Sequence, residues 1–196
     1  MFTIFLDIET TGLDPRQHHP IDIALKVVDH ESGEEKASYQ QLIKLSEESW
    51  ASHDPVSIEI NGYAFEDLKE GKSIDEVTTD IIALFTDLEI ERGKAVFICQ
   101  NPAFDRAFFG HIVPVYTQEL LNWPYHWLDL ASMYWVLFNR DLKKSNQPFP
   151  ERVNLSKNTI GEQFEIAPES DPHRAMNGVV HLIDCYRAVM EHAVSG

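Results

Sequence analysis

The stretch Phe5-Leu6-Asp7-Ile8-Glu9-Thr10-Thr11-Gly12 decides how the rest of this sequence is interpreted. Its apolar residues, with Ile4 before them, predict a buried strand over residues 3–8. Because side chains alternate between the two faces of a strand, Asp7 and Glu9 point the same way, roughly 6–7 Å apart along the backbone. Two like charges at this spacing repel, and they require a cation, a shared proton or water between them, unless the strand end simply exposes both to solvent.

The composition predicts a globular protein with a sizeable core. A chain of 196 residues with 43% hydrophobic content suits one domain spanning residues 1–196. No stretch approaches the roughly 20 apolar residues of a membrane span, and the N-terminus has no basic and apolar secretion signal. The two cysteines, Cys99 and Cys185, lie far apart, which argues against a disulfide scaffold and a cysteine-bound zinc. We therefore expect a cytoplasmic protein with no membrane partner.

The net charge of −16 opposes a simple nucleic-acid interpretation, because a protein that binds long duplexes usually presents a basic face. Bound divalent metal would reverse the sign of the charge locally. A group of basic residues also falls within one short stretch, and a solvated loop accounts for this group equally well. Its members are Arg140, Lys143, Lys144, Arg152 and Lys157.

The order of the predicted elements indicates the fold class. Strands are predicted over residues 3–8, 21–28, 38–45 and 95–100, the first three as an antiparallel meander. Helices are predicted over residues 74–88, capped by Ser73, and from Asn101-Pro102, where Asn caps and Pro fits the first turn. Further helices are predicted over residues 129–138 and from residue 171, with a loop at residues 143–150. Strands followed by interleaved helices predict an α/β fold, a mixed central sheet flanked by helices.

Two further residues are candidates for a site with Asp7 and Glu9. Asp105 falls in the first turn of the helix that opens at Asn101, where the helix dipole favours an ionised acid. An acid that merely completes a helix N-terminus gives the same pattern. His173 follows Asp171-Pro172 near the start of the last helix, a place where a lone histidine is usually just a surface residue.

Taken together, these motifs resemble those of the DEDD 3′–5′ exonucleases, specifically the subgroup with a catalytic histidine. Residues 7–12 resemble the first family motif, D-x-E-T-T-G, and residues 101–105 resemble the second, N-x-x-F-D. His173 opens a segment that resembles the third motif, H-R-A. The resemblance covers residues 3 to about 189, and it implies a ribonuclease-H-like fold.

The resemblance implies a metal-dependent 3′–5′ exonuclease that hydrolyses phosphodiester bonds at the 3′ ends of single-stranded DNA or RNA. Its catalytic residues would be Asp7, Glu9, Asp105 and His173. Asp7, Glu9 and Asp105 would hold two Mg²⁺ or Mn²⁺ ions, since hard ions prefer carboxylate oxygens. His173 would be the general base, because imidazole titrates near neutral pH. Contacts to the substrate would come from Thr10, Thr11, Gly12 and Asn101. Association with a polymerase or another protein partner is left open.

One position departs from the family pattern. An aspartate normally lies five residues after the histidine, where this sequence has Gly178. The next carboxylate, Asp184, is turned about 240° around the helix and cannot replace it. Loss of this ligand leaves three interpretations: a slower enzyme, a weak or inactive module of the same fold that binds nucleic acid or regulates, or a variant residue at this position. A metal-dependent hydrolase of a small phosphoester also stays open, because the net charge disfavours long polyanions.

Overall fold

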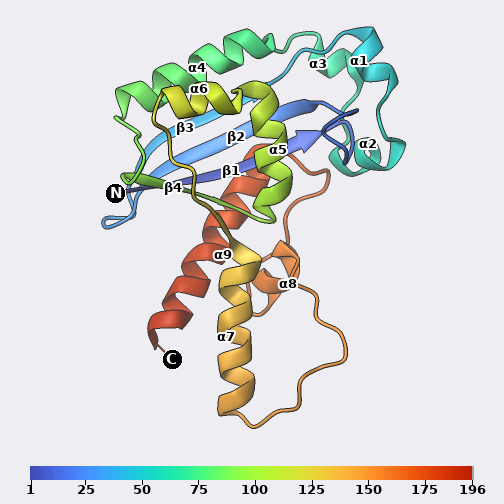
Figure 1. The fold of residues 1–196 in the computed structure, drawn as a ribbon. Coiled ribbons are helices and arrows are strands. Elements are labelled where there is room, and N and C mark those ends of the chain that lie inside the picture. Colours follow the sequence, from blue (N-terminus) through green and yellow to red (C-terminus); the bar gives the residue numbers. More distant parts are fainter. Residues whose placement is uncertain (196) are drawn as a thin grey trace.

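The strand that carries Asp7 and Glu9, β1 (Phe2–Thr10), is the middle strand of a five-stranded mixed sheet (Figure 1). The structure is a computed structural model that describes residues 1–195, so Gly196, the last residue of the predicted domain, lies outside it. The sheet has the order β3-β2-β1-β4-β5. The other strands are β2 (Pro20–Asp29), β3 (Glu35–Leu42), β4 (Ala95–Cys99) and β5 (Trp127–Asp129). β1, β2 and β3 form the predicted antiparallel meander, whereas β4 runs parallel to both β1 and β5.

Helices cover both faces of the sheet (Figure 1). One face packs against α4 (Ile74–Asp87) and α5 (Pro102–Ile112), with α6 (Val115–Leu120) beside them. The other face packs against α7 (Leu130–Lys144), α8 (Lys157–Glu162) and α9 (Ala175–Ser195). Three short helices, α1 (Glu47–Ala51), α2 (Pro55–Asn61) and α3 (Phe65–Leu68), lie near the C-terminal end of β1. Within the described chain, no helix combines the length and apolar character needed to cross a membrane.

The alternation of β1 decides which way its acids point. Ile4, Leu6 and Ile8 are buried in the core that includes α4 and α5. Phe5 is buried in the second core, together with apolar residues of α9. Asp7 therefore belongs to the face that α9 covers, since its side chain is on the same side of the strand as that of Phe5.

The start of α4 matches the prediction, whereas the start of α5 differs in its chemistry. Ser73 forms a capping box with Glu76, as a serine three residues before a glutamate favours. Asn101 does precede α5, but its side chain makes no capping hydrogen bond. Its backbone is left-handed, with φ 58°, and its N–H donates instead to Oδ1 of Asp129 at 3.1 Å. Asparagine accepts this conformation more readily than most residues, which corrects the predicted capping role.

Three predicted boundaries were wrong. β3 covers Glu35–Leu42 instead of residues 38–45, because its pairing with β2 extends back to Glu35. α7 continues to Lys144, since the polar residues after Phe138 are mostly good helix formers even though they add no apolar stripe. α9 begins at Ala175 instead of residue 171, because the Ala175 N–H donates to the Asp22 carboxylate outside the helix. The strand β5 and the short helices were not predicted.

The aromatic core beneath α5 gives a test of the fold. Phe97 on β4 is fully buried and stacks on Trp127, with ring centroids 4.1 Å apart. We expect Phe97→Ala to lower the free energy of unfolding by about 3–5 kcal/mol, because it leaves a cavity that the sheet cannot close. Urea denaturation measures this change. Tyr116→Ala, at a side chain 85% exposed, is the control and should stay within about 0.5 kcal/mol of the parent. A loss below 1 kcal/mol for Phe97→Ala would contradict this packing.

Candidate active site

The four predicted catalytic residues lie around one pocket of about 270 Å³. β1 contributes Asp7 and Glu9, the first turn of α5 contributes Asp105, and the segment before α9 contributes His173. β1 and β4 run parallel, so the C-terminal end of β1 and the helix that follows β4 meet at the same edge of the sheet. The topology therefore brings together residues that are nearly 170 positions apart in the sequence.

The carboxyl groups of the pocket are electrostatically strained. Burial raises the pKa of Asp7 to about 6. The Lys157 ammonium acts to lower this pKa, and the negative charge of Glu169 acts to raise it. Burial, with a contribution from Asp7, raises the pKa of Glu9 to about 8. Burial, and then the charge of Asp7, raises the pKa of Asp105 well above its usual range. All three carboxyl groups are thus short of positive charge, as expected of a site that binds cations.

The position of His173 is fixed by hydrogen bonds on both sides of it. Its backbone N–H donates to the carbonyl oxygen of Ile60, at the end of α2, at 3.1 Å. The neighbouring Arg174 donates to the carbonyl oxygen of Asn61, and its guanidinium lies 3.8 Å from the centre of the Tyr63 ring. These contacts place the imidazole at the mouth of the pocket before α9 begins.

A buried carboxylate on β2 holds the first turn of α9. Asp22 is fully buried and accepts hydrogen bonds from Oη of Tyr63 at 2.7 Å and from the N–H of Ala175 at 3.1 Å. It lies opposite Glu9 in the β1–β2 register, and its charge contributes to the raised pKa of Glu9. The start of α9, the end of α2 and the edge of the pocket therefore form one connected network.

The structure adds Lys157, which sequence reasoning placed in a basic group that a solvated loop explains. That interpretation was wrong for Lys157, whose side chain is only 11% exposed at the first residue of α8. Its ammonium donates to Oε2 of Glu169 at 2.8 Å and to the carbonyl oxygen of Gly178 at 3.1 Å, and lies 3.7 Å from Oδ1 of Asp7. Burial lowers the pKa of Lys157, but Asp7 and Glu169 outweigh it and raise this pKa above its ordinary value, so the amine stays charged.

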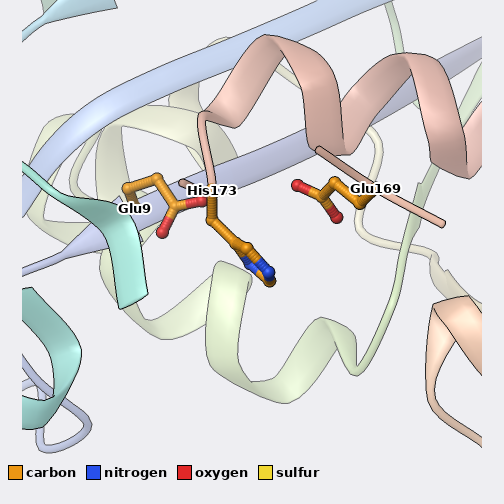
Figure 2. Close-up of side chains that lie close together, drawn as sticks. All are labelled: Glu9, Glu169 and His173. Atoms are coloured by element: carbon orange, nitrogen blue, oxygen red, sulfur yellow. The ribbon is translucent and has the colours of Figure 1, made fainter. Parts of the chain in front are cut away.

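Glu169 is the second residue that the sequence did not reveal. It lies between α8 and α9, and its side chain is 3% exposed. Donor atoms of Glu9, Glu169 and His173 all lie within 4.8 Å of one another, and Figure 2 shows the three side chains converging from separate segments. Two carboxylates and an imidazole at this spacing fit one divalent ion. Glu169 belongs to no motif, and only the fold of its loop reveals it.

Gly178 is explained by its contact with Asp7. It is buried in α9, and a Cβ atom there would lie 2.1 Å from Oδ2 of Asp7 and 3.1 Å from Nζ of Lys157. Any side chain would therefore displace the Asp7 carboxylate. Asp184 is exposed further along α9, in keeping with its predicted turn away from this position.

The loop after β1 uses its hydroxyl groups internally. Oγ1 of Thr10 donates to the carbonyl oxygen of Gly12 at 2.8 Å, and Oγ1 of Thr11 accepts from the N–H of His19 at 2.9 Å. A Cβ at Gly12 would lie 2.5 Å from the His18 ring, so any other residue here would require that ring to move. In the described part of the chain, Thr10, Thr11, Gly12 and the exposed Asn101 are not among the residues that line the pocket. Their contact with substrate stays a prediction.

The model of the RNase T exonuclease family matches residues 4–177. The chain belongs to this family. Its fold is the ribonuclease-H-like fold of the DEDD exonucleases that the motifs resemble, while membership of the histidine subgroup stays a prediction. No curated protein matches the sequence.

Solved structures of nucleases share the fold of this chain. Escherichia coli exonuclease I in complex with a dT13 oligonucleotide matches with a TM-score of 0.75 and 19% identity, over 97% of this chain and 41% of that chain. Its zinc-bound complex with single-stranded DNA matches equally well, over 40% of that chain. Cell-death related nuclease 4 matches with a TM-score of 0.71 and 14% identity, over 97% of this chain and 64% of that chain. This chain thus spans about two fifths of the length of exonuclease I.

The raised pKa of Glu9 gives a pH-dependent test. Its pKa is about 8 in the folded protein against 4.5 unperturbed, so the folded state holds a proton that the unfolded state releases. The metal-free protein should therefore lose stability as pH rises from about 5 to 8. Glu9→Gln should remove this loss and raise Tm relative to the parent by roughly 4 °C or more at pH 8, with less gain at pH 5.

Calorimetry in EDTA at both pH values measures these Tm differences. Glu162→Gln, at an exposed glutamate of α8, is the matched control and should follow the parent at each pH. Equal Tm differences between Glu9→Gln and the parent at pH 5 and pH 8 would contradict the raised pKa.

Proposed function

We propose that this protein is a metal-dependent 3′–5′ exonuclease that hydrolyses phosphodiester bonds at the 3′ end of single-stranded nucleic acid. The observation that carries this proposal is the convergence of Asp7, Glu9, Asp105 and His173 on one pocket. The oligonucleotide bound to exonuclease I, which shares the fold, supports a single-stranded substrate. The proposal treats residues 1–196 as one exonuclease domain acting in the cytoplasm, as the sequence predicts.

The proposed chemistry divides between the carboxylates and the imidazole. Asp7, Glu9 and Asp105 are the predicted ligands for Mg²⁺ or Mn²⁺, and the structure adds Glu169. When bound, such an ion supplies positive charge for the phosphate and promotes ionisation of water. His173 is the base that accepts the proton of the attacking water. Its backbone bond to Ile60 orients the imidazole toward Glu9 and Glu169 without occupying the ring.

The charge of the pocket makes metal a requirement for substrate binding. Four carboxyl groups, those of Asp7, Glu9, Asp105 and Glu169, face a single lysine. A phosphodiester entering this pocket without metal meets repulsion from a chain that already carries −16. A divalent ion reverses the local sign, which reconciles an acidic protein with a polyanionic substrate. Thr10, Thr11, Gly12 and Asn101 remain the predicted contacts to the terminal nucleotide.

A second candidate function is a weak or inactive module of the same fold that binds nucleic acid or regulates. The contact of Lys157 with Asp7 and Gly178 favours this candidate, because the ammonium lies where the missing family aspartate and its ion are expected. The two candidates differ in turnover: the first cuts its substrate, whereas the second binds an oligonucleotide and leaves it intact.

A 5′-labelled single-stranded oligonucleotide tests the first candidate. With Mg²⁺ or Mn²⁺ we expect a ladder of labelled products that shortens from the 3′ end, and EDTA should abolish it. His173→Asn should lower kcat by at least about 100-fold, the contribution typical of a positioned base. Single-turnover rates measure this change. His126→Asn, at an exposed histidine outside the pocket, is the matched control and should retain the parental rate.

Release of a labelled mononucleotide as the first product would contradict the 3′–5′ direction. Retention of an uncut oligonucleotide by folded, metal-saturated protein would replace the first candidate with the second.

A further inference from the structure

We propose that this protein binds one divalent cation, between the carboxylates of Glu9 and Glu169, and that the ammonium of Lys157 takes the place of a second cation beside Asp7. The inference rests on the proposed function and deepens it, because it assigns the positive charges of the same pocket. It replaces the two ions that the family resemblance implies with one ion and one side chain.

The first support is the set of contacts that Lys157 makes. An ammonium has three N–H donors, and two of them are used by Oε2 of Glu169 and the carbonyl oxygen of Gly178. The same nitrogen lies 3.7 Å from Oδ1 of Asp7. Lys157 therefore supplies Asp7 with the compensating charge that a bound ion would provide, from within a largely buried position.

The second support is the fit between Lys157 and Gly178. Oδ2 of Asp7 occupies the space that a side chain at position 178 would need, and Oδ1 faces the ammonium. The Cβ atom of any side chain at position 178 would lie 3.1 Å from the lysine nitrogen and 2.1 Å from Oδ2 of Asp7, so the Asp7 carboxylate would have to move. Gly178 and Lys157 are thus two parts of one arrangement, and this arrangement does not match a metal ligated by acids on β1 and α9.

The third support is the unused oxygen of Glu169. Within residues 1–195, Oε1 of Glu169 is buried and has no hydrogen-bond partner, although Oε2 is paired with Lys157. An unpaired buried carboxylate oxygen is costly, so it requires a positive partner. In Figure 2 the Glu169 carboxylate faces the ring of His173, with Glu9 beyond it, and the donor atoms lie within 4.8 Å of one another.

The nature of the donors favours a hard cation at this place. Mg²⁺ and Mn²⁺ bind carboxylate oxygens, and Mg²⁺ in proteins usually keeps several waters beside one or two carboxylates. Glu9 and Glu169 meet that need without the imidazole. His173 is then left to accept a proton, in keeping with its proposed role as the base.

Titration of the full-length protein with Mn²⁺, without nucleic acid, tests the number of ions. Electron paramagnetic resonance of free Mn²⁺ gives the amount bound, and we expect one ion per chain at saturation. Glu169→Gln should weaken this binding by at least tenfold, and Glu162→Gln, at an exposed glutamate, should not change it. Two ions of similar affinity in the parent, or unchanged binding in Glu169→Gln, would overturn the proposal.

The lysine has its own test, which also serves if Glu169→Gln fails to fold. Lys157→Met should raise the Mn²⁺ bound at saturation from one ion toward two, because Asp7 and Asp105 lose the compensating charge of the Lys157 ammonium. Lys94→Met, at a side chain 54% exposed, is the control and should bind one ion. A count that stays at one in folded Lys157→Met would show that the lysine does not exclude a second cation.

These counts are independent of nuclease activity. One bound ion in a protein that cuts no oligonucleotide would reject the proposed function and keep this inference. Two bound ions in an active enzyme would reject this inference and keep the proposed function.

Discussion

The position of Asp7 constrains everything around it. It lies on the middle strand of the sheet, on the face that α9 covers, where its carboxylate is taken largely out of water. A charge in such a place requires compensation. Gly178 leaves the space, Lys157 provides the positive charge, and Glu169 holds the lysine in place. The charge balance of the pocket and the packing of α8 and α9 on the sheet therefore depend on the same residues.

The proposed general base depends on a different set of contacts. His173 is held through Ile60 and Arg174, and the turn behind it is held by Asp22 on β2. Asp22 also accepts the hydroxyl of Tyr63, which follows α2. The proposed metal ligands come from β1, α5 and the segment between α8 and α9, whereas the proposed base is held by contacts with the end of α2.

The sequence predicted the framework and the four motif residues because both leave periodic or local signals. The alternation of β1, the cap of α4 and the spacing of Asp7 from Glu9 can all be predicted from the sequence. Lys157 and Glu169 were not predicted, because the role of each depends on contacts with residues more than ten positions away in the sequence. Lys157 sat in a basic stretch that resembled a solvated loop, and its burial follows only from the packing of α8 against α9. The sequence showed that Gly178 departs from the family motif. It did not show the structural cause, which is the contact of this position with an oxygen of Asp7.

The close fit of Gly178, Asp7 and Lys157 also constrains how this site can evolve. An aspartate introduced at position 178 alone meets an occupied space, because its Cβ would lie 2.1 Å from an oxygen of Asp7. Replacement of Lys157 alone strands Glu169 without its partner. Each step toward the four-acid family arrangement is thus unfavourable until the other has occurred. The effects of these two substitutions on stability are therefore expected to be non-additive, although the two residues lie 21 positions apart in the sequence.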